Sequence, residues 1–188
     1  MAWSPPSAVW GAAAGPALVA PGPHYREGAA ELLLGGGFFR RDSRPARDGS
    51  VLLAWHQAST TTREHPLQWL DLMAGCGIRG LRWGLEAAGA HSIPPEIVVN
   101  DADGDRRPLL EQNLKPMAWA TCSSVPAETL LCQAQLEGRR FDLIDLDAFG
   151  HPGALIQPVL QVLAPDGIVV LASTDGRSPT GHDRPGAI

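Results

Sequence analysis

Residues 71–80 read Asp-Leu-Met-Ala-Gly-Cys-Gly-Ile-Arg-Gly, and they continue a stretch, residues 68–73, that is typical of a β-strand. Gly75, Gly77 and Gly80 satisfy the pattern G-x-G-x-x-G, and a helical pattern of apolar residues follows them. Glycines between a strand and a helix let the backbone approach a bound cofactor, although they also serve plain tight turns. The stretch therefore predicts an α/β fold with a cofactor loop where this strand ends.

An acidic residue further along the chain fits the same interpretation. Asp101 follows a second expected strand, residues 96–100, and lies 21 residues beyond Gly80. A carboxylate at this place accepts hydrogen bonds from the ribose hydroxyls of a dinucleotide or of S-adenosylmethionine. The alternative is that Asp101 only forms part of a turn.

Around the loop, expected strands alternate with expected helices. The strands are residues 68–73, 96–100, 119–125, 141–146 and 167–173, and the helices are residues 78–88, 108–115, 127–136 and 154–163. This alternation is typical of βαβ units and predicts a parallel sheet. An earlier helix, capped by Asp48, is expected to carry Val51 and Trp55 after a polar lead-in at residues 24–47. We expect residues 1–23 to be a mobile tail and residues 177–188 a disordered end.

Composition limits the function classes. The chain has 188 residues, of which 44% are hydrophobic and 19% charged, which fits one globular domain. A net charge of −5 argues against tight autonomous binding of nucleic acid, although the arginines at 40, 41, 44 and 47 form either a solvated surface or a phosphate-facing patch. Three cysteines without metal-site spacing and no secretory signal predict a reducing, intracellular location, with no metal and no membrane partner.

A second motif, Asp-Leu-Asp-Ala-Phe-Gly at residues 145–150, follows the expected strand at residues 141–146. Parallel sheets place ligands at the carboxyl ends of their strands. The Asp147 carboxylate can accept hydrogen bonds from an exocyclic amine, and the Phe149 ring can stack on a flat heterocycle. Asp145 either acts directly or supports the loop. Together with the glycine loop, this motif predicts group transfer to a nucleobase.

Four stretches resemble the tRNA (guanine-26-N2) dimethyltransferase family. They are Glu27-Gly28 with the Phe38-Phe39 pair, residues 47–51, residues 71–82 and residues 145–150. The resemblance covers residues 24–176 and implies a Rossmann-like class I S-adenosylmethionine-dependent methyltransferase fold with the strand order 3-2-1-4-5-7-6. We find five of these strands, so we expect strands 6 and 7, and the family's C-terminal tRNA-binding domain, to be absent. The implied activity is methyl transfer from S-adenosylmethionine to the exocyclic amine of a guanine in tRNA.

The resemblance also implies roles for single residues, carried over by position. S-adenosylmethionine would be held by the loop that contains Asp71, Gly75 and Gly77, by Arg47, Arg79 and Asp101, and by the backbone near Ala127 and Glu128. Asp147 would accept a hydrogen bond from the target amine, a carbonyl near Ala148 would accept the second, and Phe149 would lie against the guanine. Ala148 replaces the family's proline, and Pro126 stands where an acidic residue is usual.

Two other functions remain open. One is an NAD-dependent oxidoreductase built on the same glycine loop, and the other is a non-catalytic protein that binds S-adenosylmethionine or RNA. Binding of S-adenosylmethionine rather than NAD would exclude the first. Methylation of an unmodified tRNA would exclude the second.

Overall fold

A five-stranded parallel sheet forms the centre of the computed structural model, which describes residues 22–117, 119–148 and 150–173. Its strands, in the spatial order β5-β4-β3-β6-β7, are β5 (Thr121–Ser123), β4 (Glu96–Asn100), β3 (Gln68–Asp71), β6 (Phe141–Ala148) and β7 (Leu163–Ser173). All neighbouring strands are parallel. The chain runs outward from β3 to one edge, then returns beside β3 and runs to the other. This order confirms the parallel sheet and matches the first five strands of the expected order 3-2-1-4-5.

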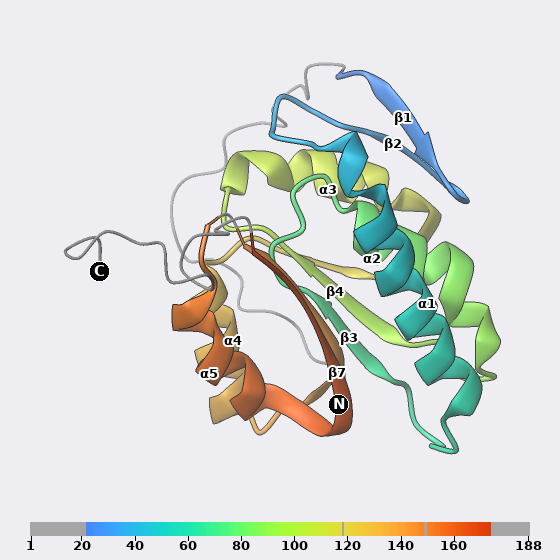
Figure 1. Ribbon diagram of the computed structural model, residues 1–188, viewed down its shortest axis with the longest axis vertical. Helices are drawn as coiled ribbons and strands as arrows, with labels where there is room; N and C mark the ends of the chain where they lie inside the picture. The colour runs from blue at the N-terminus through green and yellow to red at the C-terminus, as the bar shows by residue number, and fades with distance from the viewer. Residues whose placement is uncertain (1–21, 118, 149, 174–188) are drawn as a thin grey trace.

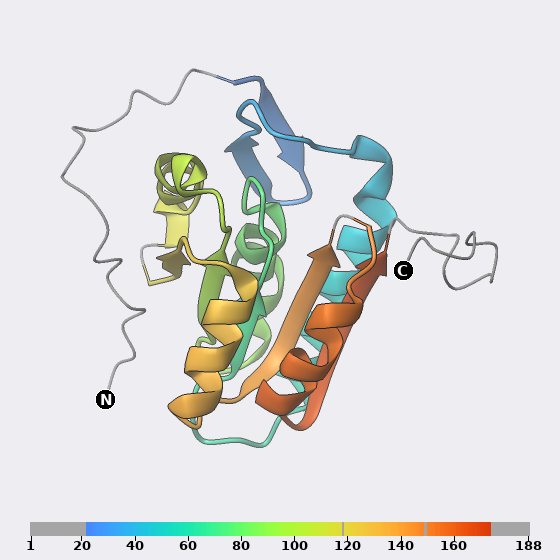
Figure 2. The ribbon, with the colours of Figure 1, turned by 90° about the vertical axis from the view of Figure 1, so that its left-hand side faces the viewer.

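Helices cover both faces of this sheet, as Figures 1 and 2 show. One face carries α1 (Arg44–Thr60), α2 (Ile78–Arg82), the π-helix η2 (Trp83–Ala87), the short η3 (Ala88–Ala90) and α3 (Arg107–Asn113). The other face carries α4 (Ala127–Leu136) and α5 (Gly153–Val162). The described residues also contain three further 3-10 turns: η1 (Arg41–Ser43), η4 (Gly104–Arg106) and η5 (Lys115–Met117). No helix among the described residues is long and apolar enough to cross a lipid bilayer.

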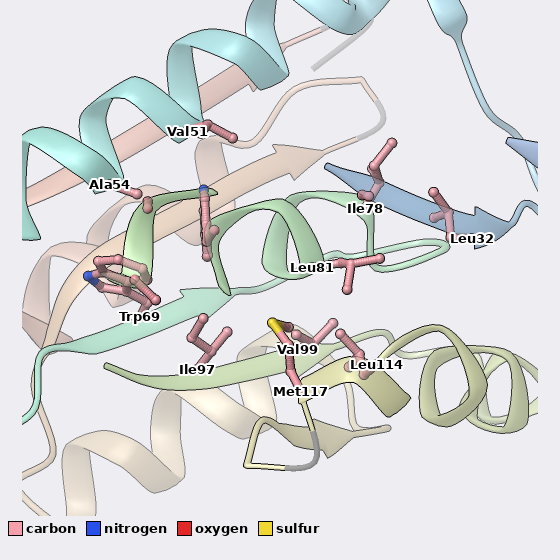
Figure 3. Close-up of a cluster of buried hydrophobic side chains, with 14 of the residues drawn as sticks. Leu32, Val51, Ala54, Trp69, Ile78, Leu81, Ile97, Val99, Leu114 and Met117 are labelled. Carbon is pink, nitrogen blue, oxygen red and sulfur yellow. The ribbon is translucent and has the colours of Figure 1, made fainter. Parts of the chain in front are cut away.

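Side chains that alternate between the two faces of the sheet divide the core into two clusters. Trp69 and Ile97 pack on the side of α1 and α2 (Figure 3), whereas Leu70 and Val98, their neighbours in sequence, pack on the side of α4 and α5. Successive strand residues point to opposite faces, so a strand covered on both sides must be apolar throughout. This requirement explains the continuous apolar runs that the sequence shows.

The prediction of a polar lead-in at residues 24–47 is wrong, because this segment contains an antiparallel hairpin. Its strands are β1 (His24–Glu27) and β2 (Ala30–Leu33). Asn113 of α3 ties the hairpin to the helix layer: its Oδ1 accepts from the Leu33 amide at 2.9 Å, and its Nδ2 donates to the Leu33 carbonyl at 2.8 Å. These contacts join residues 80 apart in the sequence, and no local pattern reveals them.

Several expected boundaries also move. The helix α1 begins at Arg44, with a proline in its first turn, so Asp48 is inside the helix and does not cap it. Asp48 instead contacts Arg82 Nη1 at 2.6 Å. The strand β7 begins at Leu163, four residues before the expected start, and its pairing with β6 shifts register between Phe141 and Leu143. Asp166, with a φ of 61°, lies in the residues of β7 that this shift leaves unpaired.

Candidate active site

A cavity of about 420 Å³ opens where β3, β4 and β6 end, beside the point at which the strand order reverses. Ligands of open α/β sheets bind at this place. Five segments supply most of its wall: residues 38–47 before and within α1, residues 72–79 after β3, residues 100–106 after β4, residues 126–128 at the start of α4, and residues 147–148 at the end of β6. The cavity therefore combines the two motifs that the sequence analysis singled out.

The glycine loop after β3 has a fixed backbone. Gly75 and Gly77 have φ values of 59° and 79°, which side chains disfavour. A Cβ on Gly77 would lie 2.9 Å from Leu110 Cδ2, and one on Gly80 would lie 2.5 Å from Val99 Cγ2. Glycine at 80 therefore allows α2 to pack closely on β4, and glycine at 75 and 77 allows the turn that aims the loop at the cavity.

Asp101 fixes the same loop from the end of β4. Its Oδ2 accepts from the Gly75 amide at 2.8 Å, and its Oδ1 accepts from the Asp103 amide at 3.0 Å. Arg106 Nε lies 3.9 Å from Asp101 Oδ1 and 3.2 Å from Asp103 Oδ2. The acid thus holds the glycine loop in place and also lines the cavity. Arg106, which also lines the cavity, is a residue that the sequence reasoning did not identify.

Three carboxylates and one guanidinium meet at the ends of β3 and β6. Asp71 and Asp145 are partners across the two strands, and each is about 1% exposed. Arg79 of α2 reaches two acids of β6, with Nε 3.2 Å from Asp145 Oδ2 and Nη1 2.6 Å from Asp147 Oδ2. Asp147 is partly exposed and lines the cavity, whereas Asp71 and Asp145 lie behind its wall.

Burial makes the two hidden acids weak. Burial and the neighbouring Asp145 charge together raise the pKa of Asp71 to about 7, against the lowering effect of the Arg79 charge. Burial also raises the pKa of Asp145 to about 6, against the lowering effects of the Arg79 charge and of a hydrogen bond from Ser50. Water would favour the ionised forms, so ionising these groups inside the protein costs free energy.

Asp71→Asn is expected to reduce the loss of stability that accompanies a rise in pH. The folded protein binds the Asp71 proton more tightly than the unfolded chain does, so its free energy of unfolding falls between about pH 4 and pH 7. An asparagine Oδ1 can still accept from the Gly80 amide, the present partner of Asp71 Oδ2. Urea unfolding at pH 4.5 and 7.5 should show that the variant loses less stability than the native chain, by about 1 kcal/mol or more.

An aspartate whose carboxylate is exposed to solvent supplies the control for this pH experiment. Asp105 is exposed on η4 and does not line the cavity. Asp105→Asn should therefore reproduce the native pH dependence. Parallel stability curves for the native chain and Asp71→Asn would contradict the assigned shift.

Arg47 lines the cavity and holds its rim in place. Its guanidinium donates to Glu27 Oε1 and Oε2 at 2.8 and 2.6 Å, and to the carbonyls of Arg40 and Arg41 at 3.0 and 3.3 Å. It also lies over the Phe39 ring, 4.8 Å from its centroid. These contacts use most of its donors within the protein, so Arg47 fixes residues 39–41 at the rim.

The predicted site residues fall into three groups. Those on the cavity wall are Arg47, Gly75, Arg79, Asp101, Ala127, Glu128, Asp147 and Ala148. Asp71, Gly77 and Asp145 lie behind the wall and shape it from there. Phe149 lies outside the described residues. The sequence reasoning gave no role to the wall residues Phe39, Met73 and Leu155, because single apolar residues carry no signal that separates a pocket wall from the core.

Among the described residues, no group of three or more His, Cys, Asp or Glu side chains could hold a metal ion. The cysteines Cys76, Cys122 and Cys132 are free thiols, and burial raises the pKa of Cys76 and of Cys122 to about 11. Both of these thiols are therefore weak nucleophiles.

Comparison with solved structures supports the fold. Trm1 from Pyrococcus horikoshii, solved with S-adenosyl-L-methionine, has a TM-score of 0.60 at 22% identity over 78% of this chain and 41% of that chain. A SAM-dependent methyltransferase from Agrobacterium tumefaciens has a TM-score of 0.61 at 18% identity over 80% of this chain and 51% of that chain. The expected methyltransferase fold is therefore confirmed.

Curated relatives and a family model agree with each other. The human tRNA (guanine(26)-N(2))-dimethyltransferase is 31% identical over 60% of this chain and 17% of its own length. The enzyme of the same name from Methanosphaera stadtmanae is 30% identical over 64% of this chain and 30% of its own length. The chain thus spans less than a third of these relatives. The model of the N2,N2-dimethylguanosine tRNA methyltransferase family matches residues 37–185, and on that match this chain belongs to the family.

Proposed function

We propose that this chain forms the catalytic core of a tRNA methyltransferase that transfers a methyl group from S-adenosylmethionine to the exocyclic N2 of a guanine. One observation carries the proposal: the Asp147 carboxylate at the end of β6 lies on the wall of the same cavity as the glycine loop. A base-binding acid and a cofactor loop then share one space. The free thiols and the family's tRNA substrate support a reducing, cytoplasmic location.

The residues of the cavity suit S-adenosylmethionine, whose methyl group is bonded to a positively charged sulfur and is therefore electrophilic. The cavity has the size of ordinary cofactor sites. Phe39, Met73 and Leu155 supply apolar wall, and Asp101 supplies acceptors for ribose hydroxyls. Arg79 also lines the cavity, where its Nε lies 3.2 Å from Asp145 Oδ2 and its Nη1 lies 2.6 Å from Asp147 Oδ2.

Asp147 has the arrangement that activation of an amine requires. Arg79 engages its Oδ2, whereas no hydrogen bond or ion pair from the described residues reaches its Oδ1. The guanine N2 is a poor nucleophile because its lone pair delocalises into the ring. An N2–H donated to Asp147 Oδ1 would increase electron density on the nitrogen and stabilise the positive charge that develops there. As the bond from N2 to the methyl carbon forms, the bond from that carbon to sulfur breaks with its electron pair left on sulfur, and Asp147 would accept the proton that N2 releases. The Ala148 carbonyl would accept the second N2–H.

Alignment supplies much of the remaining acceleration. Holding the amine in line with the methyl group makes the reaction effectively unimolecular. The guanine must leave its stack to enter the cavity, as bases do in other enzymes that modify them. Phe38 and Phe39 line the cavity at its rim and add apolar surface to the wall that the ligands would contact.

Asp101→Ala is expected to weaken binding of S-adenosylmethionine by about 1.5–3 kcal/mol, the usual effect of losing hydrogen bonds to a charged group. The change removes the acceptor for ribose and also frees the Gly75 amide. Isothermal titration measures the affinity of the native chain and of the variant for S-adenosylmethionine and, in a separate titration, for NAD. Asp105→Ala is the control, because that acid is exposed and outside the cavity. Unchanged affinity in Asp101→Ala would contradict the placement of the cofactor.

Methylation itself tests the proposed reaction. The chain is incubated with S-adenosylmethionine and an unmodified tRNA transcript, and the nucleosides are then analysed by mass spectrometry. We expect N2-methylguanosine or N2,N2-dimethylguanosine, and neither product from a transcript with adenine in place of guanine 26. Binding of S-adenosylmethionine without any product would favour the non-catalytic alternative. Preferential binding of NAD would favour the oxidoreductase.

A further inference from the structure

A continuous chain of polar contacts runs from the helix layer to the cavity. Trp83 Nε1 donates to Ser50 Oγ at 3.1 Å, and Ser50 Oγ donates to Asp145 Oδ2 at 2.8 Å. The same Asp145 Oδ2 lies 3.2 Å from Arg79 Nε, and Arg79 Nη1 lies 2.6 Å from Asp147 Oδ2. Only the last member of this chain, Asp147, is partly exposed.

The inner members of the chain are almost fully removed from water. Trp83, Ser50 and Asp145 are at most 1% exposed, and Arg79 is 8% exposed. Burying a carboxylate and a guanidinium costs free energy, and apolar side chains of similar volume pack a helix on a sheet as well or better. Packing of α1 on the sheet therefore does not explain why these polar groups are present.

The geometry of β6 explains how this series of polar contacts orients Arg79 and Asp147. Asp145 and Asp147 are two residues apart on one strand, so they point to the same face, the face covered by α1 and α2. Arg79 bridges them, and its orientation is set by Asp145 at one end and Asp147 at the other. Ser50 in turn fixes Asp145 Oδ2, the atom nearest to Arg79 Nε.

We propose that Ser50 is a positioning residue, which aligns the Asp147 carboxylate through Asp145 and Arg79 for the methyl transfer. This inference rests on the proposed function. It also gives Asp145 a supporting role behind the cavity wall in place of direct contact with the substrate. Trp83 Nε1 donates a hydrogen bond to Ser50 Oγ, so the Ser50 hydroxyl directs its own hydrogen at Asp145.

The same helix offers a matched control at the opposite end of β6. Gln57 Oε1 accepts from Trp69 Nε1 at 2.9 Å, and Gln57 Nε2 donates to the Asp142 carbonyl at 2.7 Å. Like Ser50, Gln57 accepts from a tryptophan and donates to β6, but it does so at the end of the strand remote from the cavity. A change at Gln57 removes a comparable contact between α1 and the sheet without reaching Arg79.

The kinetic experiment compares Ser50→Ala, Ser50→Thr and Gln57→Met, with the stability of each measured by urea unfolding. Ser50→Ala should lower kcat by about tenfold to a hundredfold, the effect of a small misplacement of a reacting group, with KM for S-adenosylmethionine unchanged. Ser50→Thr, which keeps the hydroxyl, should restore most of kcat. Gln57→Met should lose stability and keep kcat. Native kcat in Ser50→Ala, or an equal loss in Gln57→Met, would overturn the proposal.

A second readout does not depend on activity. Carboxyl 13C signals of aspartate-labelled protein report the environment of Asp145 and of Asp147 separately. Ser50→Ala should shift both signals, and Gln57→Met should shift neither. If the native chain does not methylate tRNA, the proposed function fails while this measurement still decides the positioning role. An unchanged Asp147 signal in Ser50→Ala would refute it in an active or an inactive chain.

Discussion

Asp147→Asn is expected to slow methyl transfer by about a hundredfold or more, comparable to the loss of one preorganised electrostatic contact in other enzymes. The amide keeps the size of the side chain but removes the negative charge that would stabilise the developing charge on guanine N2. It also removes the ion pair with Arg79 Nη1 at 2.6 Å, so the side chain loses its orientation as well as its charge. The affinity for S-adenosylmethionine should change far less than the rate.

Single-turnover kinetics with saturating tRNA measures this effect, and isothermal titration measures the binding of S-adenosylmethionine. Asp105→Asn serves as the control, because it changes an exposed acid outside the cavity by the same single charge. A full rate in Asp147→Asn would show that another group accepts the amine hydrogen. Equal losses in both variants would point to overall charge and away from the site.

Glu27→Ala is expected to cost about 3–5 kcal/mol of the free energy of unfolding, because it leaves the buried Arg47 charge without its partner. Glu27 is 1% exposed, and its Oε1 accepts from Arg47 Nε at 2.8 Å and from Arg82 Nη1 at 2.9 Å. Its Oε2 accepts from Arg47 Nη2 at 2.6 Å and from Tyr25 Oη at 2.9 Å. The alanine variant would leave the buried Arg47 guanidinium without its carboxylate partner, whereas Arg82 would keep its contacts with Asp48 and Glu86.

Urea unfolding at neutral pH measures the loss, with Glu31→Ala as the control on the neighbouring strand, since Glu31 is exposed. Burial alone would raise the pKa of Glu27, but the hydrogen bonds from Arg47 and Tyr25 and the arginine charges lower it overall. The stability that Glu27 contributes is therefore present at neutral pH and is lost as the pH falls through its lowered pKa. The two variants should accordingly differ at neutral pH and converge in acid. Equal stability of both variants at neutral pH would contradict the stabilising role assigned to Glu27 and its cluster of partners, Arg47, Arg82 and Tyr25.

The sequence predicted the sheet well because its strands are covered on both faces. Apolar runs bounded by glycine and proline located β4 and α4 at the residues where the structure has them. The hairpin β1–β2 was missed because each of its strands has four residues and its stability comes from Asn113 and from the Glu27 cluster. Such contacts join distant parts of the chain, and no local periodicity encodes them.

The placement of the candidate site residues was predictable where local rules apply and not elsewhere. The glycine pattern and the preference of ligands for strand ends predicted Gly75, Asp101 and Asp147, and the structure brings these three to one cavity. The partners of the charged residues were not predictable, because they are set by how helices lie on the sheet. Arg47 is held by Glu27, and Asp145 is held by Ser50, 95 positions away.

That separation of 95 positions has a consequence for how the protein is made. A ribosome adds about 5–20 residues per second, so about 5–20 s pass between the synthesis of Ser50 and that of Asp145. During this interval α1 can form, but β6 does not yet exist to meet its serine and glutamine. The growing chain therefore carries an uncovered helix face that a chaperone could protect, and the cavity closes only after most of the domain has been translated.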